Sequence, residues 1–187
     1  MTIASQPMTL DEFLAKYEHD PILEYAQGVV TEKTAPGWDH GILQSLVAHR
    51  LNTYLFDRKL ALAITELRTT DMAKEVSCIP DISVYAWDRI ERDPSARRRG
   101  AFTPPDIAIE IMSPGQGRQS QLDRCREFVA AGAHAALLFE PVSNSVTEVR
   151  PDRPERIYRG DDVIDLGDIV SGLTLAVGEL YAALRFE

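Results

Sequence analysis

The chain has 187 residues, of which 44% are hydrophobic and 26% are charged, and its formal net charge at pH 7 is -9. This length and composition predict a single globular domain over residues 1–187 with a core of its own. The acidic balance excludes a protein that coats nucleic acid without specificity. No apolar run approaches the ~18 residues of a membrane span, so we expect no association with a membrane.

The cysteines and the start of the chain bear on its location. Cys78 and Cys125 have neither the CxxC spacing of a zinc site nor the density of a disulfide framework. The segment Met1–Leu14 contains Asp11 and Glu12 but no basic residue and no apolar core, so we expect no secretory signal. Together these features predict a cytoplasmic protein.

The first half of the chain carries clear local signals. Thr9 and Glu12 have the spacing of a capping box, which favours a short helix. Gln27-Gly28 is typical of a tight turn between two strands, and apolar residues recur at helical spacing after Asp39. In chain order we expect a helix at residues 9–17, a hairpin at 22–34, a long helix at 39–57 and a strand at 60–67.

The second half of the chain predicts strands that alternate with helices. Ser120 is the expected N-cap of a helix, and Gly132 is expected at its C′ position. In chain order we expect strands at 79–85 and 105–114 separated by an arginine-rich loop, a helix at 120–132, strands at 135–139, 145–150 and 157–166, and a helix at 177–184. With no internal repeat and no linker, this order predicts one α/β fold.

Two of these strands carry an acidic residue among apolar, β-branched neighbours. Asp81 follows Pro80 in the first strand, and Glu110 lies between Ile109 and Ile111 in the second. Such strands are typically buried on both faces, where an unpaired carboxylate is unfavourable. Two structural interpretations stay open, because Asp81 can cap a turn into its strand and Glu110 can form a buried ion pair with an arginine.

If the two carboxylates converge, a divalent cation is the partner that fits them best. Asp81 and Glu110 would form a hard, oxygen-rich site suited to Mg²⁺, with Mn²⁺ as a substitute. Such a site supports phosphoryl transfer, because the metal binds the scissile phosphate and activates a water. The helix after Glu110 supplies Arg124 as a cation within reach of the strand end, although on base rates Arg124 is a solvated surface residue.

The charge distribution around these residues is uneven. Residues 85–126 contain eight arginines and six acids, a local charge of +2, so the remainder of the chain must sum to -11 to give the net charge of -9. A basic zone on an acidic body can steer a polyanion toward that spot. Alternatively, Arg97-Arg98-Arg99 is simply a solvated loop.

The order of several motifs resembles that of a known family. The motifs are Glu24 and Gly28 in the early hairpin, His40 at the start of the long helix, Pro80-Asp81, Glu110-Ile111-Met112-Ser113-Pro114, Phe128-Val129-Ala130-Ala131-Gly132, and Glu140-Pro141. From about Thr9 to Leu184 this order is similar to that of the Uma-two family of restriction-endonuclease-like proteins, within the PD-(D/E)XK nuclease superfamily. The resemblance implies a central mixed β-sheet flanked by helices and a Mg²⁺-dependent DNA-cleaving site.

The resemblance also assigns residues to that site. By position, Asp81 matches the metal-binding Asp of the family, and Glu110 matches the acid of its second motif. Glu24 resembles an additional acid of the family that would lie at the site. His40 matches a family histidine, to which the sequence assigns no catalytic role.

The chain departs from the family pattern at its cationic position. Met112 stands where the superfamily has a lysine, and Arg124 stands where the Uma-two pattern carries its lysine on the following helix. Because arginine stays protonated, Arg124 can orient water and stabilise charge but cannot act as a general base. Ala136 and Leu137 also replace an aromatic pair that is usual on the next strand.

These features favour a Mg²⁺-dependent DNA endonuclease or nickase that hydrolyses phosphodiester bonds. Asp81 and Glu110, with Glu24 as a candidate third ligand, would hold the metal, and Arg124 would contact the phosphate. A homodimer is expected, since nucleases of this architecture often use two centres for two strands. The alternative is a catalytically silent relative that serves as a binding or assembly module. Arginine in place of lysine favours the alternative, and the presence of both acids favours the enzyme.

Overall fold

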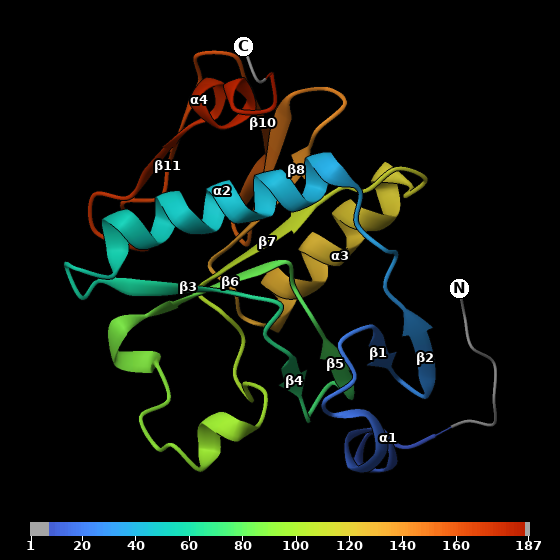
Figure 1. The fold of residues 1–187 in the computed structure, drawn as a ribbon. Helices are drawn as coiled ribbons and strands as arrows, with labels where there is room; N and C mark the ends of the chain where they lie inside the picture. Colours follow the sequence, from blue (N-terminus) through green and yellow to red (C-terminus); the bar gives the residue numbers. More distant parts are fainter. Residues whose placement is uncertain (1–7, 186–187) are drawn as a thin grey trace.

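The computed structural model describes residues 8–185 and has a mixed α/β fold built on a six-stranded sheet (Figure 1). The strand order is β10-β9-β8-β7-β6-β3, in which β7 and β8 are parallel and the other neighbours are antiparallel. In sheet order the strands are β10 (Arg153–Arg159), β9 (Ser145–Arg150), β8 (Ala135–Glu140), β7 (Ile107–Ile111), β6 (Ile82–Ala86) and β3 (Ala61–Thr65). The expected domain of residues 1–187 extends beyond the described residues at both ends.

Two smaller sheets accompany the six-stranded one. A four-stranded sheet of order β2-β1-β5-β4 is built on the early hairpin, and β11 pairs with β12 near the end of the chain. Their strands are β1 (Leu23–Ala26), β2 (Val29–Glu32), β4 (Thr69–Asp71), β5 (Val76–Cys78), β11 (Val163–Asp165) and β12 (Thr174–Ala176).

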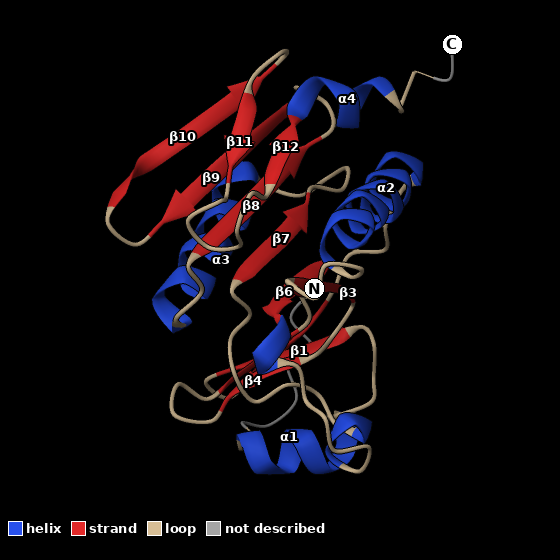
Figure 2. Ribbon diagram, turned by 90° about the vertical axis from the view of Figure 1, so that its left-hand side faces the viewer, coloured by secondary structure: helices blue, strands red, loops and turns tan. Residues whose placement is uncertain are grey.

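Helices cover both faces of the six-stranded sheet (Figure 2). Leu43 and Leu51 of α2 pack against one face, on the same core as the short helix α4. Leu122 and Phe128 of α3 pack against the opposite face. The helices are α1 (Leu10–Tyr17), α2 (Trp38–Leu55), α3 (Arg118–Ala131) and α4 (Val177–Ala182). None of the helices within residues 8–185 combines the length and the apolar character needed to cross a bilayer.

The early hairpin and α1 form as the sequence predicts. Thr9 and Glu12 make a capping box, in which the Thr9 hydroxyl accepts from the Glu12 backbone and the Glu12 carboxylate accepts from the Thr9 backbone. The turn between β1 and β2 has positive φ at Gln27 (47°) and Gly28 (89°), the combination that a type I′ hairpin turn requires. Phe13 of α1 packs against the hairpin, which anchors this unit below the main sheet in Figure 1.

The predicted ends of several elements need correction. Ser120 is not an N-cap, because α3 begins at Arg118 after the extended residue Gly117, and no side chain caps it. The single strand expected at 157–166 is two strands, β10 and β11, because Gly160 turns the chain between them with a φ of 53°. The three-residue strands β4, β5 and β12 were not predicted, since they are too short to show a period.

Candidate active site

The two acidic residues singled out by the sequence lie side by side at the junction of β6 and β7. These strands pair antiparallel with Ile82 opposite Ile109, so Asp81, the residue just before β6, comes opposite Glu110. The Oδ2 atom of Asp81 accepts a hydrogen bond from the Ile111 backbone N–H at 2.8 Å, which holds the Asp81 carboxylate against the end of β7. Both side chains are nearly covered, with exposed fractions of 3% for Asp81 and 5% for Glu110.

The alternation of side chains along β7 explains where Glu110 points. Ile107, Ile109 and Ile111 belong to the core beneath α2, whereas Ala108 belongs to the core beneath α3. Because side chains alternate between the faces of a strand, Glu110 lies on the α3 side of the sheet. A carboxylate buried between two helical layers therefore meets the helix that follows it in sequence.

Arg124 of α3 is the direct partner of Glu110. Its Nε donates to Glu110 Oε1 at 2.8 Å, and its terminal nitrogens form a bidentate pair with Glu24, with both N–O distances at 2.7 Å. A fourth bond, at 3.2 Å, goes to the Ile79 carbonyl oxygen. The prediction that Arg124 reaches back to the strand end is confirmed, and so is the interpretation of Glu110 as one member of a buried ion pair.

Glu24 joins this cluster from the hairpin strand β1. Besides its two bonds with Arg124, its Oε1 accepts from the Ile79 backbone N–H at 2.7 Å. Glu24 is therefore fixed both to α3 and to the segment that leads into Asp81. Its carboxylate oxygens are occupied by these donors, which makes Glu24 a support for the site.

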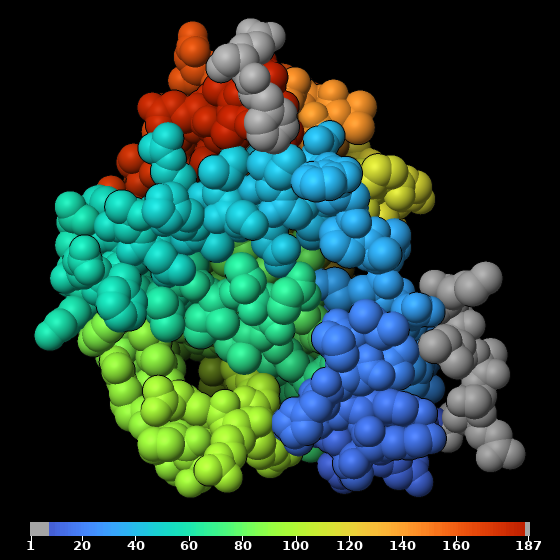
Figure 3. Space-filling view, in the orientation of Figure 1, coloured from blue at the N-terminus to red at the C-terminus, as the bar shows by residue number. Residues whose placement is uncertain are grey.

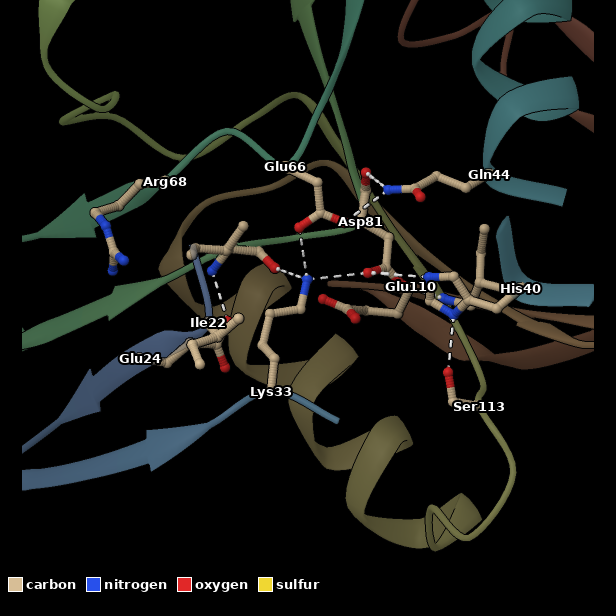
Figure 4. Close-up of polar contacts among 12 residues, drawn as sticks. Ile22, Glu24, Lys33, His40, Gln44, Glu66, Arg68, Asp81, Glu110 and Ser113 are labelled. Atoms are coloured by element: carbon tan, nitrogen blue, oxygen red, sulfur yellow. Dashed lines mark hydrogen bonds and ion pairs between the residues drawn. The ribbon is translucent and has the colours of Figure 1, made fainter. Parts of the chain in front are cut away.

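A residue that the sequence analysis missed, Lys33, lies directly beside the two acids (Figure 4). Its amine donates to Asp81 Oδ1 at 3.1 Å, to Glu66 Oε2 at 2.9 Å and to the Ile79 carbonyl at 2.9 Å. Figure 4 shows the Glu110 carboxylate close to this amine. Lys33 follows β2 without any motif around it, so no sequence signal marked it.

His40 and Gln44 approach Asp81 from the N-terminal part of α2. The His40 Nε2 atom lies 3.6 Å from Asp81 Oδ1, and its Nδ1 atom shares a 3.1 Å hydrogen bond with the Ser113 hydroxyl. Gln44 donates to the Asp81 carbonyl at 3.0 Å and to Glu66 Oε1 at 2.7 Å. The expected position of His40 at the start of the long helix therefore brings it to the site, where it links Asp81 to the exit of β7.

Burial and neighbouring charges perturb the pKa values of this cluster. The pKa of Glu110 is raised to about 8, because burial and the nearby Asp81 charge outweigh the opposing charges of Arg124 and Lys33. Burial also opposes ionisation of Glu24, but the charge and hydrogen bonds of Arg124 hold its pKa below its ordinary value. Burial opposes protonation of Lys33, yet Asp81, Glu110 and Glu66 together raise its pKa. The site thus contains one carboxyl that is easily protonated.

The donor set suits a cation that takes oxygen ligands and keeps waters. Within residues 8–185, no cluster of three or more His, Cys, Asp or Glu side chains is arranged to enclose a metal. Asp81 and Glu110 are two carboxylates, and within the same residues no hydrogen-bond donor reaches Glu110 Oε2. Mg²⁺ is commonly held by one or two carboxylates together with waters and substrate phosphates, so these two residues fit it.

A cleft opens beside the ion pair of Glu24 and Arg124. It has a volume of about 800 Å³, lies between the hairpin sheet and α3, and is also lined by Cys78 and Phe128.

The arginine-rich loop, which contains the 3₁₀ turns η1 (Trp87–Arg89) and η2 (Ala96–Arg98), forms the yellow-green lobe at the lower left of Figure 3. Arg97 is exposed there, and Arg99 pairs with Glu18 at 2.9 Å.

Comparison with known proteins agrees with this architecture. The family model Uma2, described as "Putative restriction endonuclease", matches residues 10–178. A crystal structure from Anabaena variabilis, described as that of "a putative nuclease belonging to DUF820", is similar with 30% identity and a TM-score of 0.84, over 95% of this chain and 99% of that chain. The expected restriction-endonuclease-like fold is thereby confirmed.

A second solved structure is much less similar. The cryo-EM structure of a DrdV–DNA complex matches with 14% identity and a TM-score of 0.39, over 77% of this chain and 11% of that chain, which is too low to support an argument. No curated protein matches the chain.

Proposed function

Because this chain belongs to the Uma2 family, we propose that it is a metal-dependent endonuclease that hydrolyses phosphodiester bonds in DNA, with Asp81 and Glu110 as its metal ligands. The observation that carries the proposal is the pairing of β6 with β7, which brings two buried carboxylates from distant parts of the sequence to one point. The name of the Anabaena variabilis relative, a nuclease, supports the same reaction class.

The residues at the proposed metal site have separate roles. When bound, Mg²⁺ or Mn²⁺ would hold the scissile phosphate, acidify a bound water and neutralise the charge that develops in the transition state. Asp81 is oriented for this by the Ile111 N–H, and Glu110 by Arg124. Arg124 cannot accept a proton, so its contribution is charge and position.

A second candidate function is a catalytically silent binding or assembly module. The observation in its favour is that Arg124 contacts both Glu110 and Glu24, so the two acids already share a counter-charge within the fold. In this case the carboxylates are members of a structural ion-pair network that ties α3 to the hairpin. The two functions differ in whether removal of a ligand carboxylate abolishes a reaction or only weakens the fold.

The deciding experiment incubates the purified protein with supercoiled and linear DNA in the presence of Mg²⁺ or Mn²⁺. Asp81→Asn and Glu110→Gln keep the size of each side chain and remove its charge, while Asp57→Asn changes an exposed acid as the matched control. We expect metal-dependent cleavage by the parent and the control, and a loss of about 100-fold or more in both site variants. Cleavage that survives both substitutions would rule out this site.

Oligomeric state and location belong to the same proposal. We propose a homodimer, since one centre addresses one strand at a time, and a cytoplasmic protein that acts on DNA there. Light scattering on the eluted peak of a sizing column gives the mass of the particle in solution. A mass close to the 20.9 kDa of one chain would contradict the dimer.

A further inference from the structure

We infer that Lys33 is the cation of this site that contacts the scissile phosphate, and that Arg124 is a positioning residue that holds the carboxylates. The inference rests on the proposed nuclease function and names a residue that the motifs of the sequence do not mark.

Lys33 is held at the site by the backbone of the hairpin. Its own N–H donates to the Ile22 carbonyl at 2.7 Å, so the residue continues the hairpin pairing beyond the end of β2. Its side chain is 18% exposed and ends between Asp81 and Glu66. The amine therefore lies beside a proposed metal ligand, and one of its partners, Glu66, is an exposed side chain.

Arg124 has little freedom to serve a substrate. Four bonds occupy its guanidinium, and its carboxylate partners Glu24 and Glu110 have side chains that are only 11% and 5% exposed. To turn toward a phosphate, Arg124 would have to leave at least one buried carboxylate without its counter-charge, which is strongly unfavourable. Its geometry therefore suits a residue that holds the two carboxylates in place.

Lys33 can change partners at much lower cost. Its most exposed partner is Glu66, whose side chain is 43% exposed and also accepts a 2.7 Å bond from Gln44. If a phosphate oxygen replaced Glu66 at the amine, Glu66 would keep Gln44 and gain water, because exposed ion pairs contribute little. Lysine also suits this exchange, since its flexible stem carries a compact charge with three donors.

The charges near the metal ligands require such a cation. Asp81, Glu110, Glu24 and Glu66 supply four carboxyl groups, against the charges of Lys33 and Arg124. A phosphodiester adds a further negative charge, and a positive group aimed at it lowers the energy of the transition state. Among the described residues that contact Asp81 or Glu110, Lys33 is the permanently cationic one whose partners include an exposed side chain.

The test compares Lys33→Met and Lys33→Gln with the control Lys16→Met, which removes an exposed lysine on α1. Each variant is measured for single-turnover DNA cleavage with Mn²⁺, for Mn²⁺ affinity by calorimetry, and for thermal unfolding. Lys33→Gln retains a donor for Asp81 and the Ile79 carbonyl, and it replaces the Met variant if that variant does not fold. Lys16→Met should match the parent throughout.

We expect the Lys33 variants to cleave about 100-fold more slowly or worse, while they bind Mn²⁺ about threefold more tightly or better, because a cation beside Asp81 is gone. A residue with a merely structural role would not improve metal binding as it lowers the rate. Cleavage within about threefold of the parent would overturn the inference.

The calorimetric measurement separates this inference from the proposed function. If the parent does not cleave DNA at all, the nuclease proposal fails, but the position of Lys33 at a metal site is still decided by Mn²⁺ affinity. Tighter binding in both Lys33 variants supports that position. Unchanged or weaker binding in a folded variant overturns it.

Discussion

Arg124 and Glu24 form a bidentate ion pair that joins α3 to the hairpin strand β1, with both N–O distances at 2.7 Å. The two side chains are 100 residues apart in the sequence, and each is mostly covered, with exposed fractions of 21% and 11%. This pair fixes the hairpin against α3 and so places Ile79, which both residues contact, just before Asp81. Its stability is therefore coupled to the geometry of the site.

Glu24→Gln should lower the free energy of unfolding by about 3 kcal/mol, because it leaves the Arg124 charge with half of its carboxylate partners. Urea titration followed by circular dichroism measures the change. Glu179→Gln is the matched control, since its partner Arg50 is 3.2 Å away in a pair that is more than half exposed on both sides. Equal effects of the two substitutions would contradict the special role of the Glu24 pair.

Glu110→Gln should flatten part of the pH dependence of stability. Burial raises the pKa of Glu110 from 4.5 to about 8, so the folded chain keeps a proton that the unfolded chain releases. This contribution to the free energy of unfolding is fully present below about pH 4.5 and is lost as the pH rises through about 8. Denaturant titrations of the parent and the variant across this pH range, without metal, measure the difference in the free energy of unfolding. If that free energy changes with pH equally in both proteins, the raised pKa of Glu110 is refuted.

Mn²⁺ binding should also report the protonation of Glu110, because the metal displaces the proton of that carboxyl. A ligand carboxylate must be ionised, so Mn²⁺ affinity is expected to rise with pH up to about 8, and binding below that pH should release a proton from Glu110. Calorimetry in two buffers with different ionisation enthalpies counts the protons. Mn²⁺ binding whose heat is the same in both buffers at about pH 6.5 would show that Glu110 is not a ligand or is already ionised.

The acidic residues of the site could be predicted from the sequence, because acids are unusual in or beside apolar strands. Glu110 in β7 stands out because an acid is rare between two buried isoleucines, and Asp81 precedes β6 in the order expected for the family. Arg124 was predicted from the helix that follows. The structure adds the physical link among them, since the strand pairing and the α3 face bring all three together.

The remainder could not be predicted, because long-range packing determines it. Lys33 looks like any solvated lysine near a strand end, and Glu66 lies in a loop after β3 with a positive φ of 53°. They become neighbours only because the hairpin sheet packs against the segment that leads into β6. Short strands such as β5, which pairs with β1 in that sheet, give no periodic signal in the sequence. The start of α3 was misplaced for a similar reason, since Arg118 is held by Glu140 at 2.7 Å and not by a capping side chain.

The hydroxyl of Ser83 is the buried side-chain polar atom without a hydrogen-bond partner within residues 8–185. Ser83 lies on β6 two residues after Asp81 and is fully buried, so its hydroxyl is desolvated without compensation. Ser83→Ala should therefore raise the free energy of unfolding by about 1 kcal/mol. Ser77→Ala is the matched control, because the Ser77 hydroxyl is equally buried but bonded to Arg68 at 3.1 Å and to Thr70 at 3.0 Å, and its loss should destabilise the fold. A loss of stability in both serine variants on urea titration would contradict the prediction, because it would show that the Ser83 hydroxyl is hydrogen-bonded in solution.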